Sequence, residues 1–593
     1  MTGLDWSIIV AYFVIAGGIG LAMSRRGGRS IADYFVGGRA LPWWLAGTSM
    51  VATTFAADTP LAVTEMVAQY GVAGNWLWWN MVMSGILTVF FYARLWRRAG
   101  VLTDVEFTEL RYGGKPAAVL RGFRAAYLAL PINLIIMGWV NLAMVEIASV
   151  ALDIPRLWAL LVCFFLAASY SILAGLWGVV VTDFFQFGLA FGGAVVLAVF
   201  AVGAVGGITG MEAGLAEQFG SAESALSLLP AEGVVWMPTI TFAVYLGMNW
   251  WASWYPGAEP GGGGYIAQRI FSARSERDGL LATLWFNVAH YAVRPWPWIL
   301  VALASTILYP NLENPAQGYV MAIVDLLPPG LTGLLLAGFA AAYMSTISTQ
   351  LNWGASYLVN DLYARFLKPS AGEKELVRVS RGCTALLMLA SLVVTYFLTS
   401  IEGAWRFLLA IGAGTGLVLI LRWYWWRINA WSEISAMAAS LVVSLVLWFA
   451  AGLDPDDPIQ WAWIMIGTVG ASTAVWLSVT FLTSPEPDPV LDRFYRRVRP
   501  GGPGWYDIAD RLGYGREGMD GGTLNWTNWL AGVTAVYSTL FGTGKLIFGE
   551  PGQAAVFLGL ALVSFVWIAR NLRRLPADRG GEAGESSSAS ARS

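Results

Sequence analysis

A polar break inside a bilayer-length apolar segment is the first stretch of this chain whose residue types could do chemistry. Residues 37–71 read GGRALPWWLAGTSMVATTFAADTPLAVTEMVAQYG. Lipid offers no partner to a loose backbone amide or a carboxylate, so such a break persists only where it lines a cavity or binds a ligand. Pro60 removes a backbone donor and disfavours helical geometry at Thr59, which frees carbonyl oxygens. The break therefore predicts half of an ion and substrate site, with Thr54 and Asp58 beside it.

Small and hydroxylated residues follow one face of a second apolar segment, 331–362. Ala342, Ser345 and Thr349 recur at steps of three and four, which places them on one side of a helix. Such a face either lets another helix approach closely or supplies oxygen ligands to a cation. Ser345 and Thr346 are adjacent, and the carbonyl of Ala342 lies one turn earlier. This arrangement favours cation binding as the interpretation.

Charged side chains inside other apolar segments are further candidates. Asp183, in GLWGVVVTDFFQF, is either a functional intramembrane carboxylate or an interfacial residue that caps a helix N-terminus. Arg294 must find a carboxylate or a water-filled cavity, so a role opposite an anionic substrate group is one interpretation. His290, four residues earlier, is typical of a hydrogen-bonded structural group.

Aromatic residues crowd the stretch 245–269, YLGMNWWASWYPGAEPGGGGYIAQR. One interpretation is an aromatic belt at the membrane interface followed by a flexible loop. The other is a second broken helix, in which Trp250 and Trp254 stack on a substrate and Asn249 contributes a polar group. The glycines do not form a phosphate-binding loop, because no Gly-Lys-Ser/Thr follows them.

Composition places the whole chain in the membrane. Of its 593 residues, 57% are hydrophobic and only 12% are charged, about half the charged fraction of a soluble protein. A net charge of −2 argues against a nucleic-acid partner. Cys163 and Cys383 lie in apolar runs and predict neither a disulfide nor a metal site. No separate catalytic domain or nucleophile–base pair is visible, so we expect no enzyme activity, no organic cofactor and no metal beyond an alkali cation.

The distribution of Lys and Arg predicts the topology. The first apolar run, Leu4 to Met23, is followed by Arg25 and Arg26, which places the N-terminus outside. About 15 spans, including separate spans at 157–177 and 179–206, fit the asymmetry and leave the C-terminus cytoplasmic. Gln268 and Arg269 fall in a cytoplasmic segment between two of these spans.

Several motifs together resemble the sodium:solute symporter family, which contains sodium/sugar and sodium/proline symporters. They are GGRALPWWLAGTSMVA, TDFFQ, the QR pair, AAAYMSTIST, NDLY and GAGTGLVLILRWYWW, and they cover roughly residues 1 to 450. The resemblance implies an all-α polytopic membrane protein with a LeuT-like core of five plus five inverted-repeat helices. One extra N-terminal and about four extra C-terminal helices would complete it. The implied regions are 1–43 (extra helix and loop), 44–206 and 207–427 (the repeats), 428–482 (additional helices), 483–527 (cytoplasmic connector), 528–571 (helix pair) and 572–593 (disordered tail).

The resemblance also implies roles for particular residues. The family's sodium site falls on the carbonyls of Ala52, Phe55 and Ala342 and the hydroxyls of Ser345 and Thr346. Asp183 matches an aspartate linked to sodium coupling. Residues that would face the substrate are Thr54, Asp58, Thr59, Asn249, Trp250, Trp254 and Arg294. The polar residues that bind sugar in relatives are not clearly reproduced, so the identity of the solute does not carry over.

These observations predict a sodium-coupled symporter that imports a small organic solute by alternating access. It would lie in the plasma (inner) membrane, with Na⁺ as the coupling ion, the solute and the lipid bilayer as its partners, and no nucleic acid. The alternative from another class is a ligand sensor that uses the transporter fold and signals through residues 483–527. The sequence leaves the oligomeric state open.

Overall fold

The computed structural model describes residues 1–27, 31–253, 260–398, 401–516 and 522–574. Within these ranges the chain is helical, and its one strand-like pairing is a parallel bridge between Leu41 and Ala273. Nine of the described helices are long and apolar enough to cross a membrane. The predicted all-α polytopic architecture is therefore confirmed, whereas the predicted number of spans stays a prediction.

The first predicted break is present and divides one membrane segment into two helices. Helix α3 (Trp43–Thr54) ends where Phe55 leaves helical geometry (φ −87°, ψ 60°), and α4 begins at Asp58 (Asp58–Tyr70). Pro60 lies in the first turn of α4, where the missing amide would have no intrahelical partner. The carbonyls that must find partners outside the regular helical pattern are therefore those at the end of α3.

The aromatic stretch forms a second interrupted segment. Helix α14 (Thr239–Val244) continues through the π-helix η5 (Tyr245–Asn249) into α15 (Trp250–Ala252), and the next described helix is α16 (Gly264–Ser272). The two interrupted segments are in contact at one end. There the Leu41 amide, just before α3, donates to the carbonyl of Ser272, the last residue of α16, over 2.9 Å. Of the two interpretations of this stretch, the structure supports a second broken helix rather than an aromatic belt followed by a loop. Trp254 lies outside the described residues.

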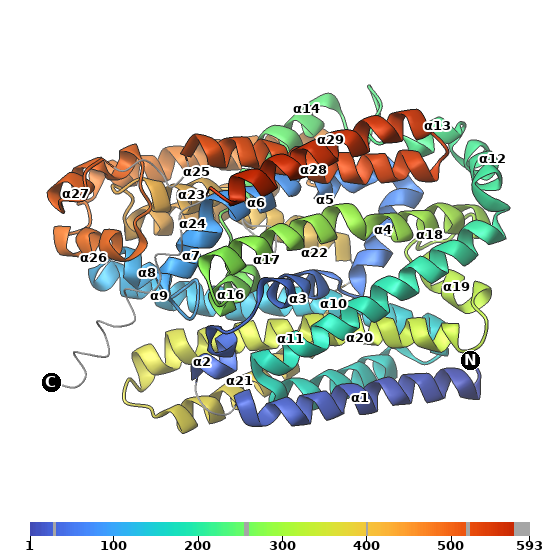
Figure 1. The fold of residues 1–593 in the computed structure, drawn as a ribbon, viewed down its shortest axis with the longest axis horizontal. Coiled ribbons are helices and arrows are strands. Elements are labelled where there is room, and N and C mark those ends of the chain that lie inside the picture. Colours follow the sequence, from blue (N-terminus) through green and yellow to red (C-terminus); the bar gives the residue numbers. More distant parts are fainter. Residues whose placement is uncertain (28–30, 254–259, 399–400, 517–521, 575–593) are drawn as a thin grey trace.

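Long helices surround these two interrupted segments (Figure 1). Helix α11 (Arg156–Ala204) is one continuous element of 49 residues where two spans were expected. At 1.5 Å per residue it is about 74 Å long, so it holds more than one bilayer thickness of helix. The others are α1 (Gly3–Gly27), α9 (Gly114–Tyr127), α10 (Asn133–Leu152), α17 (Glu276–Val288), α18 (Pro295–Leu308), α20 (Leu331–Ser356), α21 (Glu373–Phe397), α22 (Ile401–Gly412) and α23 (Gly416–Tyr424).

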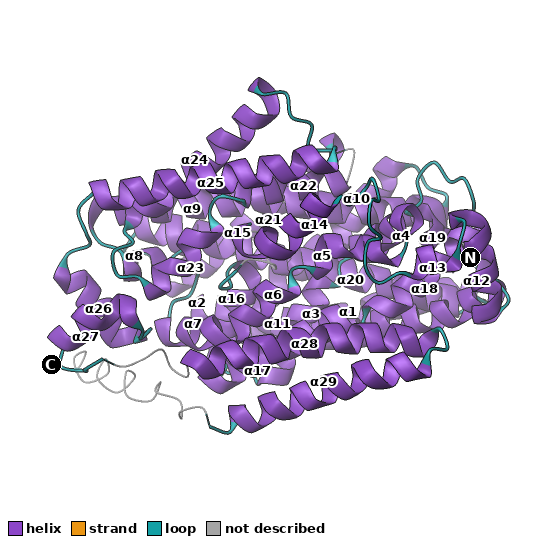
Figure 2. Ribbon diagram, turned by 90° about the horizontal axis from the view of Figure 1, so that it is seen from above, coloured by secondary structure: helices purple, strands orange, loops and turns teal. Residues whose placement is uncertain are grey.

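Two helical hairpins lie along opposite long edges of the molecule (Figure 2). One is α24 (Ala430–Leu445) with α25 (Pro458–Leu482), and the other is α28 (Gly522–Ile547) with α29 (Pro551–Leu572). The second hairpin is attached to the centre by side-chain hydrogen bonds, among them that from Tyr537 to the Trp79 carbonyl at 2.9 Å.

The segment expected to be a connector contains a folded cap at one end of the bundle. Helices α26 (Asp488–Val498) and α27 (Tyr506–Arg511) pack there, opposite the end that carries α12 (Gly207–Phe219) and α13 (Ala222–Leu226) (Figure 1). Trp505 is fully buried and donates to the Trp423 carbonyl at 2.7 Å. The segments predicted to be cytoplasmic and external therefore lie at opposite ends of the helices.

Candidate functional site

The end of α3 and the middle of α20 meet at a hydroxyl. Thr346 Oγ1 donates to the Thr53 carbonyl at 2.8 Å and to the Ala342 carbonyl at 3.1 Å. Thr53 Oγ1 in turn lies 3.1 Å from Thr349 Oγ1. The small, hydroxylated face of α20 thus both packs closely against α3 and turns oxygen atoms toward the break. The two interpretations of that face are compatible.

All five residues assigned to a sodium site lie at this junction and are buried. Ala52, Phe55, Ala342, Ser345 and Thr346 are each 3% exposed or less. The Phe55 amide still reaches the Ala52 carbonyl at 3.1 Å, but the turn at Phe55 directs its own carbonyl off the helix axis. The junction therefore gathers carbonyl and hydroxyl oxygens of the kind that a dehydrated alkali cation requires.

Asp183 lies directly behind this junction. Its two carboxylate oxygens accept hydrogen bonds from Ser345 Oγ at 2.6 Å and from Ser49 Oγ at 2.5 Å. Because α11 begins at Arg156, Asp183 lies in the interior of the helix, and a role as an N-terminal cap is excluded. The carboxylate is therefore hydrogen-bonded directly to one of the predicted sodium ligands, the Ser345 hydroxyl.

Arg269 and Gln268 are site residues that the sequence interpretation missed. They were expected in a cytoplasmic segment, but both are buried in α16. Arg269 donates to Thr349 Oγ1 at 2.7 Å and lies 3.8 Å from an Asp183 oxygen, while Gln268 donates to Asn352 at 2.8 Å. The apolar neighbours in YIAQRIF could have indicated their burial; charge counting concealed it.

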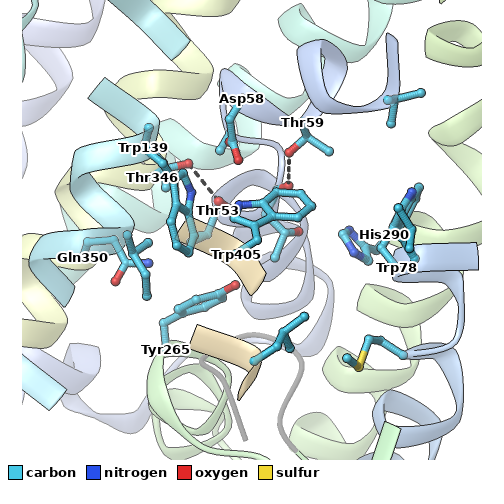
Figure 3. Close-up of a pocket in the computed structure, with 18 of the residues that line it drawn as sticks. Thr53, Asp58, Thr59, Trp78, Trp139, Tyr265, His290, Thr346, Gln350 and Trp405 are labelled. Atoms are coloured by element: carbon cyan, nitrogen blue, oxygen red, sulfur yellow. Dashed lines mark hydrogen bonds between the residues drawn. The ribbon is translucent and has the colours of Figure 1, made fainter. Parts of the chain in front are cut away.

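A cavity of about 130 Å³ opens beside the break. Figure 3 shows Asp58 and Thr59 on one side of it, Tyr265 on the opposite side, and Thr346 and Gln350 next to Thr53. Its wall includes Thr54, Asp58 and Thr59, three of the residues expected to face a substrate. Six aromatic side chains contribute to the rest of the wall: Trp78, Trp139, Tyr265, His290, Tyr291 and Trp405.

Three other residues expected to face a substrate are not among those that line this cavity. Asn249 is buried and bonded to Asn80 at 3.1 Å, and the ring of Trp250 stacks on Trp529 at 5.7 Å. Arg294 donates to the carbonyls of Val51 at 3.2 Å and Thr54 at 2.8 Å. Its guanidinium therefore donates hydrogen bonds to carbonyl oxygens at the end of α3.

Comparison with known proteins places this arrangement in a class. The most informative solved structure is a Na⁺-coupled sialic acid symporter in a substrate-bound outward-open state. It matches with a TM-score of 0.66 and 19% identity, over 82% of this chain and 99% of that one. The fold is therefore that of the LeuT-like inverted-repeat membrane transporters.

The sequence comparisons identify the family. The model of the sodium:solute symporter family matches residues 34–457, and the chain belongs to that family. The sodium/glucose cotransporter of Vibrio parahaemolyticus is 26% identical over 75% of this chain and 85% of its own length. The human sodium/myo-inositol cotransporter 2 is 24% identical over 74% of this chain and 69% of its own length. The predicted family and the class of sodium-coupled symport are confirmed, in preference to a sensor.

Proposed function

We propose that this symporter binds Na⁺ between the end of α3 and the middle of α20, and that the bound ion prepares the adjacent cavity for a small organic solute. The ligands are the carbonyls of Ala52, Phe55 and Ala342 and the hydroxyls of Ser345 and Thr346. The observation that carries this assignment is the 2.8 Å hydrogen bond from Thr346 to the Thr53 carbonyl, which brings oxygen-rich parts of both helices together.

Asp183 supplies negative charge to this ion site through Ser345. The Ser345 hydroxyl donates to Asp183 at 2.6 Å, so its lone pairs are free to turn toward a cation. Arg269 lies on the other side of the same carboxylate, at 3.8 Å. A sodium ion and the guanidinium thus share Asp183 as a counter-ion. Sodium binding would therefore change the interaction of Asp183 with Arg269 on α16.

The α3–α4 break couples the ion to the solute. Ala52 and Phe55 would bind the ion, while Thr54, Asp58 and Thr59 line the cavity next to them. Sodium that fixes the break in one geometry fixes part of the substrate wall as well, and such differential affinity is what coupling requires. The membrane potential contributes about 2.3 kcal/mol per charge per 100 mV to inward sodium movement.

The orientation belongs to the same proposal. The cap formed by α26 and α27 lies at one end of the bundle, and α12 and α13 lie at the other. Arg-rich segments accompany the cap, whereas residues 207–234 contain neither Lys nor Arg. By the positive-inside rule the cap faces the cytoplasm of a plasma-membrane protein with an external N-terminus.

Sodium binding to the purified protein tests the site. We expect the Ser345→Ala, Thr346→Ala double variant to bind ²²Na⁺ at least tenfold more weakly than the parent. Ser478→Ala, which removes an exposed hydroxyl on α25, is the control and should bind sodium normally. Unchanged sodium affinity in the double variant would overturn the assignment.

A further inference from the structure

Among the described side chains that line the cavity, three buried polar atoms have no hydrogen-bond partner. They are Asp58 Oδ1, Gln350 Oε1 and Trp405 Nε1. Asp58 is 3% exposed and Gln350 is 2% exposed, so bulk water does not serve them. Buried acceptors and donors in folded proteins are nearly always paired. The cavity therefore fits an occupant that offers a donor or a positive charge to each of the two oxygens and an acceptor to the indole N–H.

Aromatic rings enclose the space in front of these atoms. Trp78 lies against His290 at 5.5 Å and stacks on Tyr291 at 5.6 Å, and these rings form one wall. Trp139 and Trp405, 6.2 Å apart, form another wall (Figure 3). Ring faces carry partial negative charge and attract cations that lie over them. Such walls favour a cation over an anion.

The charges at the wall have one sign. Asp58 is a carboxylate, and neither Lys nor Arg is among the described residues that line the cavity. Arg294 donates to His290 Nδ1, which must then accept, so the imidazole is neutral. Arg294 lies behind the wall, close enough to Asp58 for the two charges to attract each other. Its guanidinium is nevertheless hydrogen-bonded to the carbonyls of Val51 and Thr54, and no ion pair joins it to Asp58 in the described part of the chain.

The volume limits the size of the occupant. A cavity of about 150 Å³ accommodates benzene, and this one measures about 130 Å³. An occupant of about the size of benzene, which has roughly six non-hydrogen atoms, fits that space. A hexose or a cyclitol with its full set of hydroxyls is larger.

We infer that the solute carried by this symporter is a small organic cation: an amine or ammonium compound with at least one N–H or O–H donor. The cationic group lies between the aromatic walls and faces Asp58, and the donor reaches Gln350. This inference rests on the proposed sodium-coupled function and names its substrate class. It separates this chain from the sodium/glucose and sodium/myo-inositol relatives, whose named solutes are uncharged.

Binding of a matched pair of probes to the purified protein in saturating Na⁺ tests the inference. Choline and 3,3-dimethylbutan-1-ol have the same shape and hydroxyl group, and only choline is charged. Isothermal titration should show choline, or the smaller ethanolamine, binding at least tenfold more tightly than the neutral isostere. The preference should disappear in Asp58→Asn, which preserves the shape of the side chain. Because the probe comparison is made in the parent protein, it does not depend on the folding of this variant.

The outcomes separate this inference from the proposed function. Equal binding of the two probes, tighter binding of myo-inositol or glucose, or no binding of either cation while ²²Na⁺ binding is intact would overturn the cationic substrate and leave the sodium site standing. We expect the preference for choline to disappear in sodium-free buffer, which would show that the sodium site and the cavity are coupled. Failure of the parent protein to bind ²²Na⁺ would overturn the proposed function itself.

Discussion

The Arg294 guanidinium donates to the carbonyl oxygen of Thr54 over 2.8 Å, at the last residue of α3. A second hydrogen bond reaches the Val51 carbonyl, and the cation lies over the Trp298 ring at 4.9 Å. The carbonyl end of a helix carries partial negative charge, which a buried arginine offsets. Arg294, at the start of α18, therefore offsets the partial negative charge at the carbonyl end of α3.

Replacement of Arg294 should destabilise the protein at the break, because its charge and its hydrogen bonds to the α3 carbonyls are lost together. Arg294→Gln removes the charged donor from two buried carbonyls, which keep only neutral hydrogen bonds, and a hydrogen bond to a charged group contributes about 1.5–3 kcal/mol. We expect a lower midpoint of thermal unfolding in detergent and weaker ²²Na⁺ binding, because Ala52 and Phe55, which we propose as sodium ligands, lie on the same turn. Arg493→Gln, an exposed change with a single carbonyl contact, is the control. Sodium affinity equal to that of the parent would show that Arg294 supports only the fold.

Removal of the charge of Asp183 should weaken sodium binding without removing the sodium ligands. Asp183→Asn keeps a hydrogen-bond acceptor for Ser345 but leaves Arg269 without its carboxylate. We expect at least a tenfold loss of ²²Na⁺ affinity and a stronger dependence on the membrane potential in proteoliposomes. Glu373→Gln removes one charge from an exposed position and should change neither measurement. An Asp183→Asn protein with normal sodium affinity would exclude a coupling role.

Structural features that depend on one segment alone were predicted well from the sequence. The break at residues 55–57 followed from Pro60 and the polar residues beside it, and the face of Ser345 and Thr346 followed from helical spacing. Neither inference required knowledge of any distant contact.

Predictions failed where a side chain's partner lies far along the chain. Arg269 was assigned to a loop because charge usually marks solvent, yet Asp183 and Thr349 hold it in the core. For Arg294, a role opposite an anionic substrate group was one interpretation; its observed partners include backbone carbonyls of α3, which have no sequence signature. The aromatic cavity wall was missed as well, since its rings come from five separate segments of the chain.

A methyl group at Gly416 should disturb the second interrupted segment. A Cβ there would overlap the carbonyl oxygens of Trp251 and Ala252, at the end of α15. Gly416→Ala must push α23 away from that end, and overpacking of this kind costs about 1–3 kcal/mol. Gly470→Ala in α25 meets nothing within 4 Å and should be neutral or slightly stabilising. The two midpoints of thermal unfolding, compared with the parent, check the prediction; equal values would show that the contact yields without cost.

Arg111 connects the cap to the transport core, and its replacement should loosen the cap first. Its guanidinium donates to the Arg422 carbonyl at 2.7 Å and the Trp425 carbonyl at 3.0 Å, past the end of α23. The same group lies 5.2 Å from the ring of Phe494 and 5.0 Å from that of Trp505.

Lysine can keep the charge of Arg111 but not the planar fork or the stacking. We therefore expect Arg111→Lys to cost about 2 kcal/mol of stability and to expose residues 484–514 to limited proteolysis at low protease concentration. Arg493→Lys, on the exposed side of α26, should leave the cleavage pattern unchanged. If sodium-driven transport also slows in Arg111→Lys, the cap restrains the movement of α23 during alternating access. A protease-resistant Arg111→Lys cap would show instead that Phe494 and Trp505 hold it through apolar packing alone.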